Sequence, residues 1–355
     1  MKIALIADTH WGVRSDNIAF LDMNKKFLDN IFFPLIDTMG IDTVIHLGDL
    51  VDRRKYINIQ TANRLRMDFI QPIKDRKIKY HQILGNHDVY YKNTNGINSF
   101  NELYGTQFCM YQDTTEIKIG DLPILFVPWI NQSNKDQSLE AIKKSNSKVC
   151  MGHLEIEGFE MFRGSVATHG EDRVLFDRFH STFSGHFHHR STDGSIYYLG
   201  SHGQFTWSDY GDERGFHIFD TETLEVTFIK NPYNMFSKIF YDDKDKTNDK
   251  VLDQDFSQFA GTYGKLIVKN KENPYWFDLF CNKIEKAGLI DYQIVEDHHN
   301  LNIEDDTEIT SETQSTVDIF KRYISSSTWN SNVNIEKLEQ TIVSLYNEAA
   351  AFSEV

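Results

Sequence analysis

Aspartate, asparagine and histidine residues follow several short apolar runs of this chain, in a pattern that could bind metal ions. They are Asp8 and His10 in "ADTH", Asp49 in "LGD", Asn86 in "GNHD", His153 in "MGH", and His186 and His188 in "GHFH". Divalent cations of intermediate hardness accept such oxygen and imidazole ligands. The set is too large for one octahedral ion that must also hold water and substrate. The pattern therefore predicts two ions that share a bridging carboxylate.

The apolar runs before these residues are typical of strands in an α/β protein. They cover residues 2–8, 42–49, 79–88, 147–153 and 181–187. Apolar residues at helical spacing between the first three runs predict helices over 17–39, ending at Gly40, and over 59–75. Because the carboxyl ends of parallel strands open on one crevice, we expect the polar residues to converge there.

The middle of the chain is richer in strands than in helices. Residues 114–129 predict a hairpin around Gly120 and Asp121, and further strands are expected at 195–201 and 214–220. Residues 221–229 would complete a second hairpin. The predicted fold class is α/β, with two sheets packed face to face between flanking helices, a small α/β capping domain and C-terminal helices.

Composition indicates a folded protein of the reducing cytoplasm. Of the 355 residues 40% are hydrophobic, and 26 Phe and 16 Tyr can fill a sizeable core. Cys109, Cys150 and Cys281 are too far apart to suggest a disulfide framework or a thiolate metal site. The N-terminal apolar run is too short for a signal peptide, and no apolar run approaches the ~20 residues of a membrane span. We therefore expect a cytoplasmic protein with no membrane partner.

The formal net charge of -15 argues at first against a nucleic-acid partner. Carboxylates that hold metal ions account for part of this charge, because the ions reverse it locally. Acidic residues also concentrate in the last third of the chain, whereas basic ones accompany the motifs. The candidate DNA-binding residues are Arg53, Arg54, Lys55, Lys92, Arg163 and Arg190. For the first three, an ordinary solvated surface is the alternative interpretation.

The motifs "DTH", "GDLVD", "GNHD", "GH" and "GHFH", in this order, resemble the signature of the calcineurin-like metallophosphoesterases over about residues 1–230. The chain length, the stretch "GDERGF" at 211–216 and the C-terminal extension are similar to a narrower group, the SbcD-type DNA-repair nuclease subunits and their phage counterparts. This resemblance implies two Mn²⁺ ions, with iron, zinc or magnesium as alternatives.

The resemblance also implies roles for single residues. One ion would be held by Asp8, His10 and His188, the other by Asn86, His153 and His186, with Asp49 between them. His87 would stabilise the phosphate oxygens or protonate the leaving oxygen, and Asp88 could orient its ring. Relatives often have a histidine where Asp52 stands, which puts a second catalytic histidine in doubt. Among the other histidines, His46 and His217 are expected to pack in the core and His189 to lie at the surface.

The function that the resemblance implies is a manganese-dependent DNA nuclease that acts as an exonuclease on DNA ends and as an endonuclease on single strands. Its expected partners are DNA and an SMC-like ATPase of the SbcC type, with a homodimer of this chain inside a heterotetramer. A phosphodiesterase or phosphatase for small nucleotides is one alternative. A non-catalytic scaffold for the ATPase, with metal used for folding, is another.

Four segments are expected along the chain. Residues 1–230 form the nuclease domain, 231–297 a DNA-capping domain, 298–312 a linker, and 313–355 the ATPase-binding helices. The polar, acidic composition of 297–312 is typical of a linker. A generic α/β appendage remains the alternative for the cap. Helices that fold back on their own domain remain the alternative for the tail.

Overall fold

The computed structural model describes residues 1–296, together with residues 335, 337, 338 and 341. Contacts divide the chain after Ile303 into two units, and the fold and the site described below lie in the first. The predicted linker and the tail helices fall outside the described residues, except for the four tail positions, which are helical. No helix of the described part is long and apolar enough to cross a membrane.

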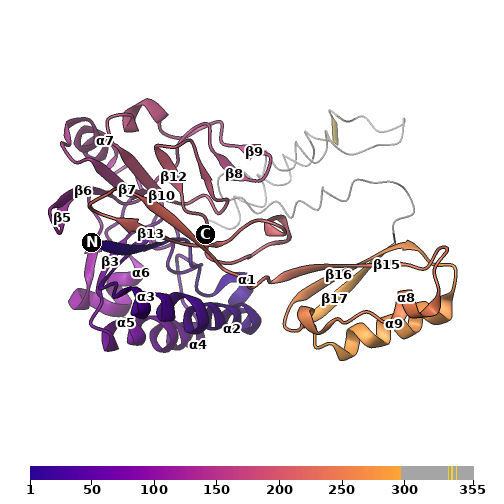
Figure 1. Cartoon of the computed structure of the whole chain (residues 1–355). Coiled ribbons are helices and arrows are strands. Elements are labelled where there is room, and N and C mark those ends of the chain that lie inside the picture. Colours follow the sequence, from indigo (N-terminus) through magenta and orange to yellow (C-terminus); the bar gives the residue numbers. More distant parts are fainter. Residues whose placement is uncertain (297–334, 336, 339–340, 342–355) are drawn as a thin grey trace. The chain divides into compact units, whose positions relative to one another are not determined.

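The first six-stranded sheet has the order β14-β13-β1-β2-β3-β4 (Figure 1). Its strands are β1 (Lys2–Ile6), β2 (Thr43–Leu47), β3 (Lys79–Ile83), β4 (Cys109–Tyr111), β13 (Gly215–Asp220) and β14 (Val226–Lys230). β1 to β4 are parallel, whereas β13 pairs antiparallel with both β1 and β14. The β13–β14 pair is the second of the two predicted hairpins.

The second six-stranded sheet has the order β11-β12-β10-β7-β6-β5. Its strands are β5 (Thr115–Ile119), β6 (Leu122–Val127), β7 (Val149–His153), β10 (Ser181–Gly185), β11 (Ser191–Thr192) and β12 (Ile196–Tyr198). β6, β7, β10 and β12 are parallel, and β5 with β6 forms the hairpin expected around Gly120 and Asp121. A separate short hairpin joins β8 (Glu160–Phe162) and β9 (Ser165–Val166).

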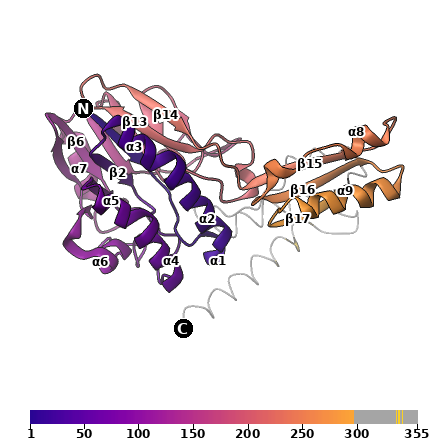
Figure 2. The same cartoon turned by 60° about the horizontal axis from the view of Figure 1, so that its bottom comes forward.

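The two sheets face each other across an apolar core, as expected. Leu5, Ile45 and Ile83 of the first sheet pack in one cluster with Phe126 and Phe183 of the second. Helices cover the outer faces (Figures 1 and 2). They are α1 (Val13–Asp16), α2 (Ile18–Phe27), α3 (Phe33–Met39), α4 (Ile59–Arg64), α5 (Gln71–Asp75) and α6 (Ser99–Tyr104) on the first sheet's side, and α7 (Lys135–Lys144) on the second's.

Each of the two long helices predicted from the sequence is interrupted by a π-helical turn. Leu28–Phe32 separates α2 from α3, and Leu65–Ile70 separates α4 from α5. Pro34 and Pro72 lie at the start of the segments that follow. A proline has no N–H for the helical bond and its ring clashes with the carbonyl four residues earlier, so the backbone widens before it. Gly40 ends α3 at φ 63°, as its position predicted.

A smaller α/β layer follows the two sheets. A parallel sheet of order β15-β16-β17 packs against α9 (Pro274–Lys286) through a separate apolar cluster. The strands are β15 (Phe236–Asp242), β16 (Tyr263–Asn270) and β17 (Asp291–Glu296). The sequence predicted a small α/β layer in this region, but its pattern did not indicate β15 or α8 (Asn248–Leu252). The many charged residues from 242 to 250 obscured the alternating pattern of β15.

Candidate metal centre

The residues predicted as metal ligands lie at the carboxyl ends of strands from both sheets. Asp8 and His10 follow β1, Asp49 follows β2, Asn86 follows β3, His153 ends β7, and His186 and His188 follow β10. The Asp and His residues of this set, together with His87, form three overlapping groups. Within each group the ligand atoms lie within 4.8 Å of one another. The two groups that do not contain His87 are described first, because they match the predicted division of ligands.

The first group contains Asp8, His10 and His188. His10 Nε2 and His188 Nε2 are 3.0 Å apart. Asp8 Oδ1 accepts a hydrogen bond from the main-chain N–H of His186 at 3.0 Å, while Asp8 Oδ2 is buried without a hydrogen-bond partner. Burial of this carboxylate raises the pKa of Asp8 to about 7. A buried, unsatisfied carboxylate oxygen is costly unless a cation or donor meets it.

The second group contains Asp49, His153 and His186, and Asn86 lies among them. Asn86 Oδ1 is 2.9 Å from His153 Nε2 and 3.0 Å from His186 Nδ1. Asp49 Oδ2 is 3.3 Å from His153 Nε2. With the Asn86 amide turned over, its nitrogen would donate to these three atoms and its oxygen would accept from Arg54 Nη2 at 3.2 Å. Only the first orientation presents an oxygen to a metal ion.

One oxygen of Asp49 lies between the two groups, close to a histidine from each. Asp49 Oδ2 lies 3.6 Å from His10 Nε2 and 3.3 Å from His153 Nε2, and the side chain is 2% exposed. Burial disfavours ionisation, but the neighbouring imidazoles of His153 and His87 outweigh it and hold the pKa of Asp49 well below its usual range. The carboxylate is therefore ionised and placed where a bridging ligand would be needed.

The donor set fits a pair of divalent ions. An octahedral ion with bonds of about 2.1 Å places neighbouring ligand atoms about 3.0 Å apart. The separations of 3.0 Å between His10 and His188 and 2.9 Å and 3.0 Å around Asn86 agree with this value. The unpartnered Oδ2 of Asp8 supplies a further free ligand atom. The residues present thus fit two ions, one in each group.

The backbone at the strand ends is strained in a way that aims these side chains. Asp8, His10, Asp49 and His186 have φ values of 51°, 41°, 56° and 85°, in the left-handed region that non-glycine residues rarely adopt. Such strain concentrates at functional sites. Gly85 is needed for a different reason, close approach, because a Cβ there would lie 2.1 Å from Asp49 Oδ1.

His87 and Asp88 have different surroundings from each other. The Nδ1 of His87 donates to the main-chain carbonyl of Asp52 at 2.5 Å, and the His87 ring lies edge-on to that of His10 with centroids 4.6 Å apart. The Asp88 carboxylate is buried and accepts hydrogen bonds from the main-chain N–H groups of Gly85, Asp49, Leu50 and Val51 at 2.8–3.3 Å. The expected role of Asp88 in orienting His87 thus belongs to the Asp52 carbonyl, while Asp88 joins two strand-end loops.

Three contacts around the centre were not anticipated from the sequence. His153 Nδ1 donates to the main-chain carbonyl of Leu47 at 2.8 Å, and Asp52 Oδ1 lies 3.3 Å from His10 Nδ1. Arg214, which is 3% exposed, donates to the main-chain carbonyl of His188 and pairs with Asp209 at 2.8 Å. The stretch "GDERGF" drew attention to this region, but nothing local in it indicates a contact with a residue 26 positions earlier.

The predicted basic residues divide into two sets. Arg54 lies beside Asn86, and Arg53 pairs with Asp16 at 3.1 Å, while Lys55 is exposed on the same loop. Arg163 and Arg190 instead pair with the acidic residues Asp212 and Glu213 at 3.1 Å and 3.3 Å, and Lys92 is exposed after β3. Arg54 is therefore the basic residue of this set with a described contact to a candidate ligand.

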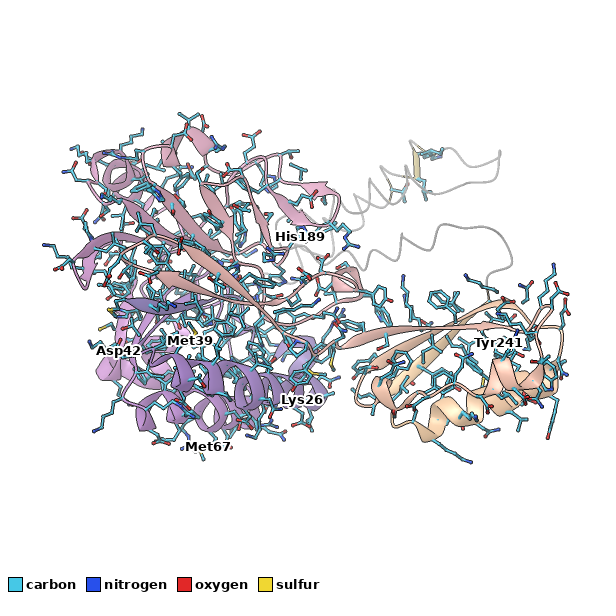
Figure 3. All side chains as sticks on the ribbon, in the orientation of Figure 1. Lys26, Met39, Asp42, Met67, His189 and Tyr241 are labelled. Atoms are coloured by element: carbon cyan, nitrogen blue, oxygen red, sulfur yellow. The ribbon has the colours of Figure 1, made fainter. Side chains whose placement is uncertain are left out.

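The other histidines behave largely as the sequence predicted. His46 is buried, its Nε2 is 2.9 Å from Thr9 Oγ1, and burial lowers its pKa to about 3. His217 is buried as well. His189, expected at the surface, has a side chain 19% exposed and pairs with Asp212 at 2.8 Å and Glu160 at 3.2 Å (Figure 3).

Comparison with known proteins agrees with this geometry. Residues 1–190 match the family described as calcineurin-like phosphoesterase. Exonuclease subunit 1 of Enterobacteria phage T4 is 30% identical over 98% of this chain and 99% of its own length. Among solved structures, a dimetal phosphatase from Danio rerio (11% identity, 61% of this chain and 91% of its own, TM-score 0.40) and an archaeal phosphodiesterase (15% identity, 65% and 100%, TM-score 0.33) are similar. At these TM-scores the structural likenesses do not bear on function.

Proposed function

Because this chain belongs to the calcineurin-like phosphoesterase family, we propose that it is a DNA nuclease that uses two Mn²⁺ ions. The observation that carries the proposal is the position of one Asp49 carboxylate oxygen between the two groups of ligands, 3.6 Å from His10 Nε2 and 3.3 Å from His153 Nε2. The full-length similarity to an exonuclease subunit favours a nucleic acid as the substrate, and we propose DNA. Carboxylate, amide and imidazole ligands suit Mn²⁺ and also accept iron, zinc or magnesium.

In this proposal, Asp8, His10 and His188 would hold one ion, Asn86, His153 and His186 would hold the other, and Asp49 would lie between them. The ions would supply Lewis-acid polarisation of a phosphodiester and a lower pKa for the attacking water. His87 has its Nδ1 fixed on the Asp52 carbonyl. In the imidazolium form, the proton on its Nε2 would pass to the leaving 3′-oxygen or form a hydrogen bond to a phosphate oxygen. Arg54, beside Asn86, would contact a phosphate of the bound strand.

An assay on end-labelled duplex and single-stranded DNA with Mn²⁺ tests the proposal directly. Release of nucleotides from duplex ends, together with internal cleavage of single strands, is the expected result. Turnover of a chromogenic phosphodiester without cleavage of DNA would instead make the protein a small-nucleotide phosphodiesterase. Binding of an ATPase partner with no hydrolysis of either substrate would make it a scaffold.

We expect Arg53, Arg54 and Lys55 to contribute to DNA affinity without sequence preference. Replacing all three by Ala should weaken DNA binding similarly for every sequence and flatten its salt dependence by up to about three units of slope, because each lost phosphate contact removes about one released counterion. The ion pair of Arg53 with Asp16 reduces its share. Binding titrations over a range of salt concentrations measure the slope.

The matched control for this variant replaces Arg163 and Arg190, which pair with Asp212 and Glu213. Because these ion pairs already neutralise both guanidinium groups, the control should change the slope less. Hydrolysis of a small chromogenic diester should survive in the triple variant. Unchanged DNA affinity at low salt would return residues 53–55 to an ordinary solvated surface.

We further propose that the chain forms a homodimer and works with an SMC-like ATPase of the SbcC type. The relative in phage T4 is described as a subunit, which supports a partner of some kind. Residues 313–355 are the proposed docking helices, with Ile335, Leu338, Ile342 and Leu345 along one stripe of the sequence pattern. Apolar anchors at this spacing are typical of a helix that binds in a groove.

Removing residues 313–355 should abolish ATPase association and ATP-stimulated cleavage but leave basal nuclease activity. The reason is that every proposed ligand lies at or before His188. Leu338→Asp combined with Leu345→Asp should act in the same way, because two desolvated carboxylates oppose docking. A pull-down with the ATPase, alongside the manganese nuclease assay, measures both effects. Aggregation or loss of basal activity on truncation would show that the tail packs on its own domain.

A further inference from the structure

The carboxylate of Asp52 contacts one nitrogen of the His10 ring, and the candidate metal position lies at the other. Asp52 Oδ1 is 3.3 Å from His10 Nδ1, whereas His10 Nε2 is 3.0 Å from His188 Nε2 and 3.6 Å from Asp49 Oδ2. The His10 side chain is 3% exposed, so solvent has little access to its Nδ1. Nδ1 makes no aligned hydrogen bond within the described chain, which leaves Asp52 as its polar neighbour.

Even without an aligned hydrogen bond, the charge of a nearby carboxylate biases which nitrogen of a neutral imidazole carries the proton. A carboxylate favours N–H at Nδ1, and this tautomer leaves the lone pair of Nε2 free for a metal ion. His153 has the same arrangement, with Nδ1 on the Leu47 carbonyl at 2.8 Å and Nε2 toward Asn86 and Asp49. The difference is that the partner of His153 is main chain, whereas the partner of His10 is a side chain that substitution can remove.

Asp52 also contacts His87, but through a different atom. Its main-chain carbonyl accepts the hydrogen bond from His87 Nδ1. Substitution of the Asp52 side chain therefore removes the contact with His10 and retains the hydrogen bond to His87. The Asp52 side chain is 23% exposed, so its replacement leaves no closed cavity in the core. Substitution of the Asp52 side chain therefore tests the contact of its carboxylate with His10 without removing the main-chain hydrogen bond to His87.

We infer that Asp52 is a positioning residue for His10, which sets the tautomer and orientation of that ring for the metal position formed by Asp8, His10 and His188. The inference rests on the proposed two-metal function. Asp52 need not contact DNA or the reacting phosphate in this role.

The metal-free protein gives the first test, because the tautomer of His10 can be read without any ion. Nitrogen-15 NMR of the full chain should show His10 mainly as the Nδ1–H tautomer. Asp52→Ala should convert it to a mixture of tautomers, and Asp52→Asn, which retains a neutral acceptor, should give an intermediate result. Asp16→Asn is the control, because it removes one negative charge from a carboxylate that accepts hydrogen bonds from Arg53 and Thr61. It should leave the His10 tautomer unchanged. An unchanged His10 tautomer in Asp52→Ala overturns the inference.

Calorimetric titration with Mn²⁺ gives the second test. Wild-type protein should bind two ions, and Asp52→Ala should weaken one position by about 10- to 100-fold while the other is unchanged. Asp52→Asn should restore part of the loss, and the electron paramagnetic resonance signal of the coupled manganese pair should appear only at higher metal concentration in both variants. Equal weakening of both positions, or of neither, would contradict the inference.

The outcomes for Asp52 and for the proposed function can be told apart. A wild-type protein that binds two ions but cleaves no DNA refutes the nuclease and leaves the role of Asp52 intact. A wild-type protein that does not bind two ions refutes the two-metal centre, and the tautomer measurement then decides the role of Asp52 alone. Circular dichroism of each variant verifies that it is folded.

Discussion

Asp49→Asn is expected to abolish metal-dependent cleavage, with the rate falling by at least about 10³-fold. The substitution keeps the shape of the side chain but removes the charge of the one oxygen that lies 3.6 Å from His10 Nε2 and 3.3 Å from His153 Nε2. Because this oxygen lies close to a histidine of each group of ligands, the affinity for both ions should fall. Calorimetric titration with Mn²⁺ and the DNA cleavage assay measure the two effects separately.

A second buried carboxylate provides the matched control for Asp49→Asn. Asp68 is 8% exposed and pairs with Arg64 at 2.5 Å, on the helical side of the first sheet. Asp68→Asn should lower stability but leave both metal affinities unchanged. If Asp49→Asn retained two ions at wild-type affinity, Asp49 would not be the bridging ligand and the two groups would have to be assigned separately.

His87→Ala is expected to retain two metal ions and DNA affinity while losing ~10²-fold or more in rate. The bond from His87 to Asp49 Oδ1 comes from the main-chain N–H at 2.8 Å, so replacement of the side chain does not remove it. What is lost is the imidazole whose Nδ1 is held by the Asp52 carbonyl. Single-turnover cleavage at saturating Mn²⁺ measures the rate, and calorimetry counts the ions.

The control for this variant is His180→Ala. His180 is an exposed histidine directly before β10, and the described hydrogen bond of its ring Nδ1 is to the neighbouring Ser181 hydroxyl. It should behave as wild type in both assays. A stoichiometry of one ion in His87→Ala would place His87 among the metal ligands. The geometry allows this to be tested, because His87 forms a group with His10 and Asp49 within 4.8 Å.

Local sequence patterns predicted most of the elements. The strands expected over 2–8, 42–49 and 79–88 correspond to β1, β2 and β3, and the hairpins around Gly120 and at 221–229 are present. Alternation and helical spacing are properties of neighbouring residues, so they can be read without knowing the fold. The π-helical turns before Pro34 and Pro72 were missed, because the apolar spacing continues through them. β15 was missed because charged residues follow it directly.

The sequence by itself determined the set of candidate ligands, because their residue types and their places at strand ends are local features, and parallel strands bring such ends together. Only the tertiary structure decided how these ligands are supported. Asp52 meets His10 across 42 positions of the chain, Leu47 meets His153 across 106, and Arg214 meets His188 across 26. These contacts depend on the distance between folded loops, on burial that excludes water, and on which nitrogen of a ring faces which neighbour. None of these quantities is encoded in the spacing of residues along a strand or a helix, so they become visible only when the two sheets are packed together.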